Sequence, residues 1–406
     1  MQTLLCLLGI AVFPALAWLC SSQRRRVNLR TTGIAFALQF LLGAVALYVP
    51  AGRVLLENIS QGVAGVLAFA QAGIEFIFGE IGSYSLGTVF AVHVLPVVVF
   101  FASLVSVLYY LGVMGWIIRL IGGALQALLG TSKAESMSAA ANIFVGHTEA
   151  PLVIKPHLPH MSRSELFSVM VVGLSTVAGS VLAGYVALGV ELRYLLAASF
   201  MAAPGGLLMA KLLEPETSDV RSREADPPLS SDLHVNIVDA AAAGATDGLK
   251  LALNIGAMLL AFVALIAMLN GILTWLGSLV GVEGLTLQVL LGWLFRPLAL
   301  LLGIPWGESL QAGSLIGQKL VFNEFVAYAE YSLRQASLSD YTRSVVTFAL
   351  CGFANIASVA VLLGGVGTMV PERRNEIAAL GMRAVLGGFL ANLLSAAIAG
   401  FFLSLA

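Results

Sequence analysis

Residues 135–149 read ESMSAAANIFVGHTE, a polar stretch inside an otherwise apolar chain. The polar side chains at its end are Asn142, His147, Thr148 and Glu149. An ionisable side chain in hydrocarbon costs roughly 2.5 to 3.5 kcal/mol even on lenient insertion scales, so Glu149 is a candidate functional residue. Gly146 permits the backbone to leave a helix just before His147, and irregular backbone at membrane depth persists only where it lines a cavity. The stretch therefore predicts a broken, re-entrant segment with functional side chains at its tip.

A second stretch, from Glu308-Ser309 to Glu324, has the same build as the first, from Glu135-Ser136 to Glu149. Each opens with Glu-Ser and reaches a glutamate after fourteen or sixteen residues. Each is then followed by an apolar segment that carries Ser or Thr, GLSTVAGSVLAG in the first case and CGFANIASVAVLLGG in the second. This pattern resembles the inverted structural repeats of secondary transporters. Chance similarity between two apolar, low-complexity segments is the alternative explanation.

The composition indicates a polytopic helical membrane protein. Of the 406 residues, 59% are hydrophobic and 11% are charged, and the mean hydropathy is +0.94. The net charge of −1 argues against nucleic acid as a partner, because nucleic acid requires a basic face. The three cysteines lie in apolar runs and predict neither a disulfide framework nor a metal site. No HExxH, Walker A or GxSxG motif is present, so the chain is not expected to be an enzyme.

Eight membrane spans are predicted from hydropathy, at residues 3–20, 33–50, 88–113, 165–189, 193–213, 249–275, 344–367 and 381–404. The basic run Arg24–Arg26 follows the first span, so the positive-inside bias places the amino terminus outside. A cleaved signal peptide is the alternative, but its basic residues would precede the apolar run. With one hairpin entering from each side, the carboxyl terminus also lies outside.

Two further segments differ from the spans in character. Residues 53–80 carry acidic and amide side chains at helical spacing, so they are expected to lie along the membrane interface. Residues 214–239 hold seven acidic residues against two arginines, a local charge of −5, and are expected to form a solvated linker; a regulatory segment is the alternative. His157 and His160 are expected to anchor the first hairpin in the cytoplasm, because a metal site would need a third ligand.

Several motifs resemble those of the concentrative nucleoside transporters. They are GHTEAP at 146–151, NEFVAY at 323–328, GFANIAS at 352–358, RRRVNLRT at 24–31, SAAANIFVG at 138–146, SFMAAPGGLL at 199–208 and LLGWLFRPLA at 290–299. The resemblance covers essentially the whole chain and is strongest to the bacterial sodium-coupled members. It implies an all-α membrane protein with eight transmembrane helices, two opposed re-entrant hairpins, an inverted repeat and a trimeric assembly.

The family's architecture implies a scaffold domain and a transport domain. The scaffold would comprise residues 1–113, with the interfacial helix, and the sixth span at 248–276. The transport domain would comprise residues 114–213, with the first hairpin and spans four and five, and residues 284–406, with the second hairpin and spans seven and eight. An acidic cytoplasmic loop at 214–247 would join the two halves.

The resemblance also implies a nucleoside site that is divided between the two halves. The base would contact His147, Thr148 and Glu149 at the first hairpin tip, between apolar walls from Val181 and Phe353. The ribose ligands would be Asn323, Glu324, Asn355 and Ser358. A carboxylate accepts two adjacent hydroxyl hydrogens as charge-assisted bonds, so Glu324 would favour a ribose with both hydroxyls. A role in hairpin packing is the alternative for Asn323.

The family's sodium site lies between the first hairpin and the fourth span. The matching positions in this chain are Asn142, Val145, Thr176 and Val177. A break before Gly146 would free carbonyl oxygens, which suit the hard Na⁺ ion. Thr176 replaces a serine that is common in relatives and keeps the hydroxyl. Proton-coupled relatives tend to lack the asparagine that Asn142 matches, so Na⁺ is the expected coupling ion.

His147 departs from the family pattern, which has glutamine at this position of a GQTE motif. Glutamine presents a donor and an acceptor at fixed geometry, whereas neutral histidine offers one of each on a rigid ring and protonated histidine offers only donors. The reference pKa of histidine, about 6.5, lies in the physiological range. Base selectivity and pH dependence are therefore expected to differ from the family's, unless His147 points away from the substrate.

The sequence thus predicts a sodium-coupled symporter that imports nucleosides such as uridine, cytidine or adenosine across a bacterial inner membrane. It would work as a homotrimer in the lipid bilayer, by movement of the transport domain against the scaffold, with both termini in the periplasm. A proton-coupled symporter with the same pocket is one alternative. An intramembrane enzyme is the other, and His147 with Glu149 is its only candidate pair.

Overall fold

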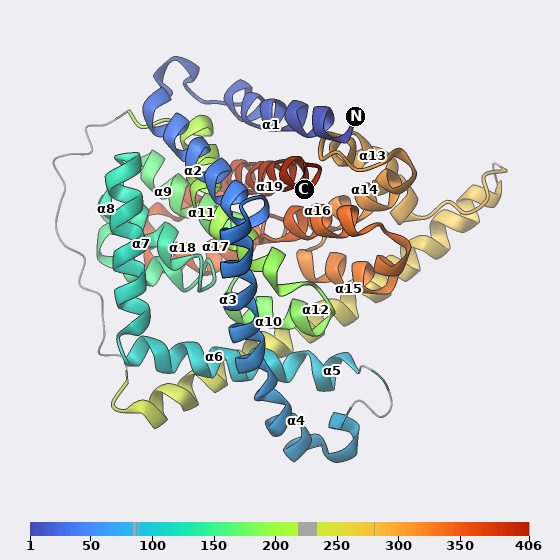
Figure 1. Cartoon of the computed structure of the whole chain (residues 1–406), viewed down its shortest axis with the longest axis horizontal. Coiled ribbons are helices and arrows are strands. Elements are labelled where there is room, and N and C mark those ends of the chain that lie inside the picture. Colours follow the sequence, from blue (N-terminus) through green and yellow to red (C-terminus); the bar gives the residue numbers. More distant parts are fainter. Residues whose placement is uncertain (84–86, 88, 218–233, 280, 406) are drawn as a thin grey trace.

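A computed structural model describes the fold over residues 1–83, 87, 89–217, 234–279 and 281–405 (Figure 1). These residues form helices and no β-strand, which confirms the all-α prediction. The first half contains α1 (Gln2–Leu19), α2 (Leu29–Leu47), α3 (Pro50–Ala68), α4 (Ala70–Phe78), α5 (Phe90–His93), α6 (Leu95–Tyr110), α7 (Val113–Leu129), α8 (Lys133–Ala141), the 3₁₀ segment η3 (Ala150–His160), α9 (Arg163–Ser175), α10 (Gly179–Ala187) and α11 (Leu192–Leu213). The second half contains α12 (Ile237–Leu279), α13 (Leu287–Leu301), α14 (Trp306–Val321), α15 (Glu324–Arg334), α16 (Asp340–Leu350), α17 (Ser358–Gly364), α18 (Val366–Met369) and α19 (Arg374–Leu403).

Eight helical stretches of the described residues are long and apolar enough to cross a membrane. The number equals the prediction, but the two sets differ in one member. Pro50–Ser83 qualifies by length and composition, although its polar side chains predict an interfacial position. The predicted span at 344–367 does not qualify, because the chain breaks between α16 and α17. Such breaks are typical of transporter helices that line a binding site.

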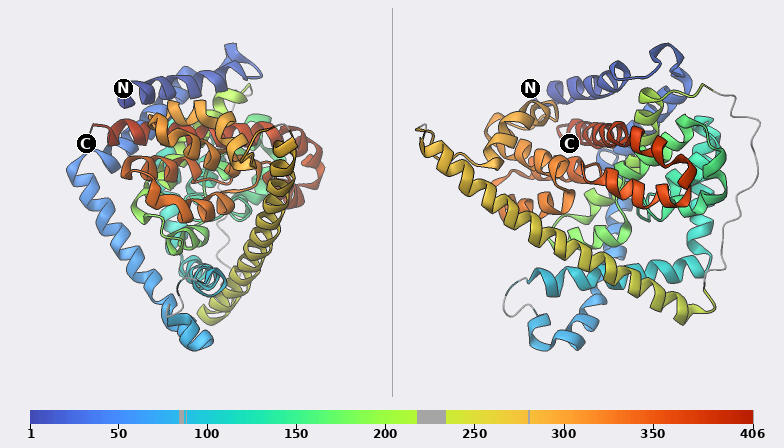
Figure 2. Two further views of the ribbon diagram at one scale, coloured as in Figure 1. Left: turned by 90° about the vertical axis from the view of Figure 1, so that its right-hand side faces the viewer. Right: turned by 180° about the vertical axis from the view of Figure 1, so that it is seen from behind.

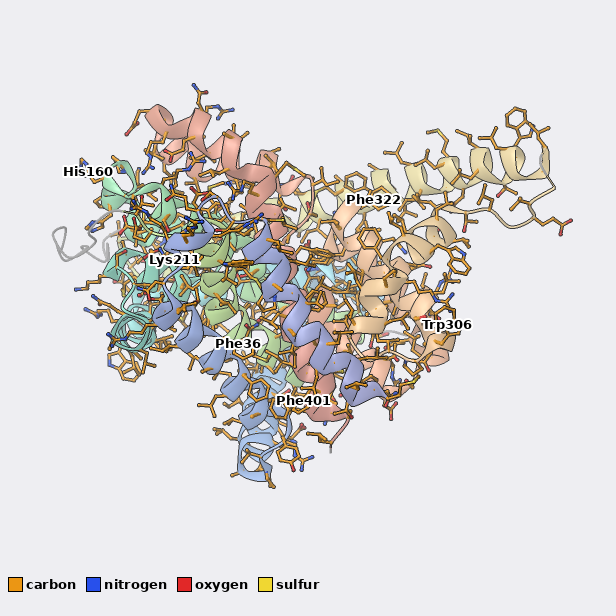
Figure 3. The ribbon with its side chains drawn as sticks, turned by 90° about the horizontal axis from the view of Figure 1, so that it is seen from above. Phe36, His160, Lys211, Trp306, Phe322 and Phe401 are labelled. Atoms are coloured by element: carbon orange, nitrogen blue, oxygen red, sulfur yellow. The ribbon has the colours of Figure 1, made fainter. Side chains whose placement is uncertain are left out.

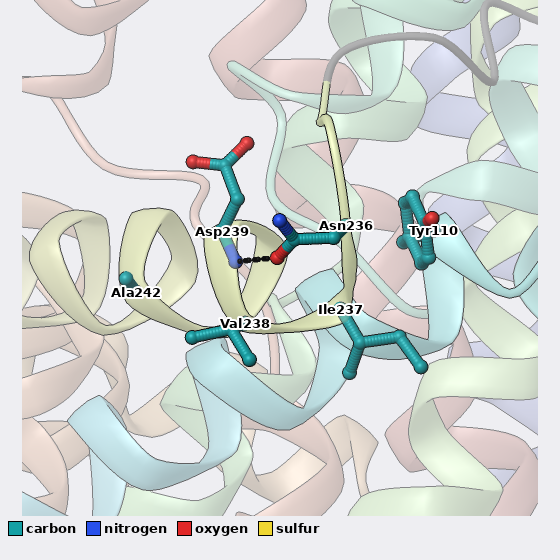
Figure 4. Close-up of a pocket in the computed structure, with 6 residues that line it drawn as sticks. All are labelled: Tyr110, Asn236, Ile237, Val238, Asp239 and Ala242. Carbon is teal, nitrogen blue, oxygen red and sulfur yellow. Dashed lines mark hydrogen bonds between the residues drawn. The ribbon is translucent and has the colours of Figure 1, made fainter.

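The helix α12 begins earlier than the sequence analysis predicted. The acidic loop was expected to reach residue 247, but the helix starts at Ile237. The Asn236 Oδ1 atom accepts the Asp239 N–H at 2.9 Å and caps the first turn (Figure 4). The alanine-rich run at 240–245 then favours helix over loop. Residues 218–233 of the predicted loop lie outside the described residues.

Two series of elements follow each other in the same order. The first is α7, α8, η3, the broken pair α9 and α10, and α11. The second is α13, α14, α15, the broken pair α16 and α17, and α19. In the second series α13 and α14 are bent by 113° at their junction. This order agrees with the repeat that the two Glu-Ser stretches predict.

The two hairpins enter from opposite ends of the molecule. Figure 1 shows α7 and α8 at one end and α13 and α14 at the other. In Figure 3, Lys211 and His160 lie on the side of the first hairpin, whereas Trp306, at the start of α14, lies on the opposite side. The two termini lie together, because the Thr3 and Ser404 hydroxyl oxygens are 2.9 Å apart. The opposed hairpins are confirmed, and the termini share one face as expected.

The centre of the molecule is built from the broken span α9–α10 with α11 and α19. Their apolar windows are 94%, 89% and 89% buried, against 17–28% for the other candidate spans. Small residues permit this close packing, as is usual between membrane helices. A Cβ atom added to Gly206 of α11 would lie 2.5 Å from the Ser175 Oγ atom, and one added to Gly388 of α19 would lie 2.9 Å from the Leu174 Cβ atom.

The helices α6 and α12 form a separate pair beside this core (Figure 2). A Cβ atom at Gly244 of α12 would lie 2.5 Å from the Ser106 Cβ atom, so the two helix backbones are in close contact. The Ser103 Oγ atom donates to the Ala241 carbonyl at 2.9 Å and fixes their register. α12 is 43 residues long and runs diagonally past the core.

The first two helices pack on the core. A Cβ atom at Gly9 of α1 would lie 2.2 Å from the Leu301 carbonyl oxygen of α13. The buried Gln39 of α2 donates from Nε2 to the Ser395 Oγ atom of α19 at 2.9 Å. A buried side-chain hydrogen bond and glycine contacts of this kind resist sliding between the helices.

Candidate substrate and cation site

Both hairpins and both broken spans meet at the centre of the molecule through backbone hydrogen bonds. The three bonds run from the Gly179 N–H to the Phe144 oxygen at 2.9 Å, from the Phe353 N–H to the Thr176 oxygen at 3.2 Å, and from the Ile356 N–H to the Leu320 oxygen at 3.0 Å. All six residues lie outside helices or at helix ends, where backbone groups lose their helical partners. The breaks are therefore stabilised by one another, and they place the site between the two halves.

His147 lies at the first hairpin tip and faces the second half. Its side chain packs against Phe353, with ring centroids 4.8 Å apart and ring planes at 62°. The residue is only 9% exposed, and within the described structure neither ring nitrogen has a hydrogen-bond partner. Gly173 faces it on α9, where an added Cβ atom would lie 2.8 Å from the His147 Cβ atom. Two buried nitrogens without partners are suited to bind a polar ligand.

The next two residues of the tip point elsewhere. Thr148 packs on the second half at Gly365, where an added Cβ atom would lie 3.0 Å from the Thr148 Cγ2 atom. Glu149 is exposed, and its carboxylate interacts electrostatically with Tyr109 of α6 and Asp247 of α12. Glu149 therefore faces the α6–α12 pair.

The predicted ribose residues form one connected group. The Asn355 Nδ2 atom donates to the Glu324 Oε2 atom at 3.4 Å and to the Phe353 carbonyl at 3.2 Å. The Asn355 Oδ1 atom accepts the Ser358 N–H at 3.0 Å, and the Ser358 hydroxyl donates to the Phe353 carbonyl. Glu324, Asn355 and Ser358 are 3–5% exposed. The break before α17 thus holds an amide and a hydroxyl beside a buried carboxylate.

Asn323 and Val181 have local structural roles. The Asn323 Oδ1 atom accepts the Val326 N–H at 2.8 Å and caps α15, so it places Glu324 in the first turn of that helix. This bond supports the packing alternative for the Asn323 oxygen and leaves its amide nitrogen for other contacts. Val181 is 2% exposed in the first turn of α10.

Tyr185 is a candidate site residue that the sequence analysis missed. It is fully buried, and its hydroxyl, which has no hydrogen-bond partner within the described residues, interacts electrostatically with the Glu324 carboxylate. Its ring lies 4.3 Å from Tyr328 and 4.8 Å from Phe325, centroid to centroid. Tyr185 follows Val181 by four residues and so shares its helix face, which is the signal that could have identified it.

The four predicted sodium ligands lie where the first hairpin meets the break of the fourth span. They are 0–4% exposed. The Asn142 Nδ2 atom donates to the Ser138 carbonyl at 2.9 Å, whereas the Asn142 Oδ1 atom has no partner within the described residues. No described backbone amide donates to the Val145 or Val177 carbonyl. The Thr176 hydroxyl donates to the Val172 carbonyl at 3.0 Å, which leaves its lone pairs free. These neutral buried oxygens fit a hard monovalent cation.

A pocket of about 650 Å³ lies away from this site, at the start of α12. Its lining residues are Tyr110, Asn236, Ile237, Val238, Asp239 and Ala242 (Figure 4). None of the predicted substrate or cation ligands contributes to it. Its residues belong to the junction of α6 and α12.

Comparison with known proteins bears on the whole chain. Residues 8–81 match the family described as "Na+ dependent nucleoside transporter N-terminus", residues 91–191 match "Nucleoside recognition", and residues 194–400 match "Na+ dependent nucleoside transporter C-terminus". The nucleoside permease NupC of Helicobacter pylori is 50% identical over 415 residues, which cover 100% of this chain and 99% of that protein. Sodium/nucleoside cotransporter 1 of Mus musculus is 39% identical over 97% of this chain and 62% of that protein.

Solved structures agree with these relatives. CNTnw in an inward-facing substrate-bound state has a TM-score of 0.94 and 54% identity, over 100% of this chain and 99% of that one. A CNTnw variant in an outward-facing state has a TM-score of 0.96 and 54% identity over the same shares. The named relatives and the matching family are nucleoside transporters and not enzymes, which confirms the prediction that the chain is not an enzyme. The chain belongs to the concentrative nucleoside transporter family and is a nucleoside transporter.

Proposed function

We propose that this transporter imports nucleosides together with Na⁺ across a bacterial inner membrane. The observation that carries the proposal is a set of oxygens on buried residues that have no partner within the described structure. They are the Asn142 Oδ1 atom and the Val145 and Val177 carbonyls, and the Thr176 hydroxyl lies next to Val177 in the chain. A cation bound there would compensate oxygens whose burial is otherwise costly. Relatives described as sodium-dependent support the same ion.

Uptake of labelled uridine into proteoliposomes tests the coupling ion. An inward Na⁺ gradient is expected to drive accumulation, and a proton gradient in sodium-free buffer is not. Accumulation that follows the proton gradient alone would replace Na⁺ by H⁺ in the proposal. Conversion of uridine to another compound would favour the enzyme alternative.

The nucleoside is proposed to bind between the two hairpin tips. Its base would meet the nitrogens of His147, which have no partner within the described residues, with Val181 and Phe353 as apolar walls. Thr148 and Glu149 lie at the same tip but point to the second half and to the α6–α12 pair, so they would have to turn to contact the base. Its ribose would meet the connected group of Glu324, Asn355 and Ser358, with the amide of Asn323 beside it. Each ribose hydroxyl would then exchange a water contact for a charged or amide partner.

His147→Gln is expected to change the ranking of cytidine, uridine and adenosine as competitors of uridine uptake. The amide offers a donor and an acceptor on one flexible arm, whereas the imidazole fixes them on opposite sides of a ring. His157→Gln, on η3 away from the tip, is the matched control and should keep the wild-type ranking. An unchanged ranking in His147→Gln would mean that this side chain does not discriminate between the bases.

We further propose a homotrimer in which α6 and α12 belong to a static scaffold and the hairpin-bearing segments 114–213 and 284–406 move. The glycine contact of α12 with α6 supports their common assignment. The family's division also gives the first two spans, within 1–113, to the scaffold. The packing of these two helices on α13 and α19 favours their assignment to the moving domain instead. If α13 and α19 slid past them, the Gly9 and Gln39 contacts would break.

Cysteine cross-links distinguish these assignments in a variant without native cysteines. Linking Val98→Cys of α6 to Gly184→Cys of α10 is expected to abolish uridine uptake, because a Cβ atom at Gly184 lies 3.5 Å from the Val98 Cγ2 atom across the proposed sliding boundary. Linking Thr3→Cys to Ser404→Cys is the control and should preserve uptake, since α1 and α19 would move together. A block by the second link as well would return the first span to the scaffold.

A further inference from the structure

Lys319 is a charged side chain that the proposed transport site does not use. It is fully buried on α14, and among the described residues no carboxylate forms an ion pair with it. Its Nζ atom donates to the Ala349 carbonyl at 2.9 Å and to the Asn392 Oδ1 atom at 2.6 Å. The Phe389 ring lies 5.7 Å from the same atom. A buried ammonium whose hydrogen-bond partners are all neutral is costly to bury, so this charge calls for a specific role.

The partners of Lys319 connect it to the carboxyl ends of α16 and α9, the first halves of the two broken spans. Ala349 is in the last turn of α16. Asn392 of α19 donates from Nδ2 to the Ser175 carbonyl, the last residue of α9, at 2.7 Å and to the Cys351 carbonyl at 2.9 Å. Helix carboxyl ends carry a partial negative charge, about half an elementary charge each, which a cation stabilises. The Lys319 charge therefore acts directly on α16 and, through the Asn392 amide, on α9.

The position of Lys319 parallels that of the proposed sodium ligands. Those ligands lie between α8 of the first hairpin and the break after α9, whereas Lys319 lies between α14 of the second hairpin and the break after α16. α8 corresponds to α14 and α9 to α16 in the two series of elements. We propose that the Lys319 ammonium supplies, at this place in the second repeat, the positive charge that Na⁺ supplies in the first. This fixed charge positions Glu324 to bind the ribose.

The connection from Lys319 to Glu324 is short. α14 ends two residues after Lys319, and Glu324 opens the next helix. The intervening Leu320 carbonyl accepts the Ile356 N–H at 3.0 Å, next to Asn355, which bonds Glu324. Holding Lys319 against α16 thus fixes the end of α14 and Asn355, the hydrogen-bond partner of the carboxylate. Lys319 is a positioning residue, because its hydrogen bonds go to Ala349 and Asn392 and not to a proposed substrate ligand.

Lys319→Met tests the inference, since it keeps most of the side-chain length and removes the charge. The uridine Kd, measured by calorimetry in detergent, is expected to rise at least about tenfold, whereas the Na⁺ affinity without nucleoside should not fall, because the lost charge has the same sign as Na⁺. A purely structural lysine would instead lower both affinities together with Tm. Equal losses of both, or a wild-type uridine Kd in the folded variant, would overturn the proposal.

Chemical rescue covers the case in which Lys319→Met does not fold. Lys319→Ala, purified and assayed with propylammonium, is expected to regain uridine binding that is lost when the amine is removed, whereas n-propanol at the same concentration has no effect. Rescue by propanol as well, or by neither compound, would overturn the fixed-cation role. The inference rests on the proposed sodium site, but its failure is distinguishable, because sodium-independent uptake by the wild type would refute the coupling without changing the response to propylammonium.

Discussion

Glu324→Gln is expected to abolish concentrative uridine uptake while the protein remains folded and inserted. The Glu324 carboxylate is 5% exposed and accepts from the Asn355 amide at 3.4 Å. It can accept both ribose hydroxyls, whereas the substituted amide offers one acceptor oxygen and presents donors in place of the other. A charge-assisted hydrogen bond is worth roughly 1.5 to 3 kcal/mol, so the uridine Kd should rise at least about tenfold.

The control for this substitution is Glu372→Gln, an exposed carboxylate outside the site. Calorimetric titration with uridine and with 2′-deoxyuridine gives a second comparison. The wild type should prefer uridine, and Glu324→Gln should lose most of that preference. If Glu324→Gln binds uridine with wild-type affinity, the carboxylate does not bind the ribose.

Asn142→Ala is expected to weaken the coupling between Na⁺ and nucleoside. In the wild type, Na⁺ should raise uridine affinity, and uridine should raise Na⁺ affinity by the same factor, because linkage between two binding sites is reciprocal. The shared element is the first hairpin, which carries Asn142 before its break and His147 after it. Removing the unpartnered Asn142 Oδ1 atom takes one oxygen from the cation and should reduce the common factor.

Two titrations measure this factor, uridine with and without Na⁺, and Na⁺ with and without uridine. Asn236→Ala, at the exposed start of α12, is a control that removes an asparagine far from the hairpin. An unchanged factor in Asn142→Ala would exclude Asn142 from the cation site. Unequal factors in the two wild-type titrations would mean that the two ligands also bind elsewhere.

The opposed hairpins could be predicted because their signals are local. Gly146 before three polar residues indicates a broken backbone, and the Arg24–Arg26 run fixes the direction of the first span. The break between α16 and α17 was not predicted. Residues 344–367 are mostly apolar, so they were predicted as one continuous span. The start of α12 was missed because two charged residues in its first three turns, Asp239 and Asp247, resemble a loop, and the Asn236 cap and the alanine run outweigh them.

The Lys319 and Tyr185 contacts could not be predicted from local patterns. Lys319 bonds Asn392 across 73 residues, and only the packing of α14 on α19 brings the two together. Tyr185 lies on the same helix face as Val181, but its approach to Glu324 depends on how α10 packs against α15. The proposed substrate ligands were accessible through motifs, whereas the placement of Tyr185 and of the groups that position those ligands depends on tertiary structure.

The length of α12 makes bilayer thickness a variable for this protein. Its residues 251–279 contain no charged side chain. As a helix this segment is about 43 Å long at 1.5 Å per residue, whereas the hydrocarbon core of a bilayer is about 30 Å thick, so full immersion requires a tilt of about 45°. A thicker bilayer would turn α12 upright, and the tight contact at Gly244 would carry α6 with it. The length of the lipid chains would then change the tilt of α6, against which the first hairpin and α10 pack.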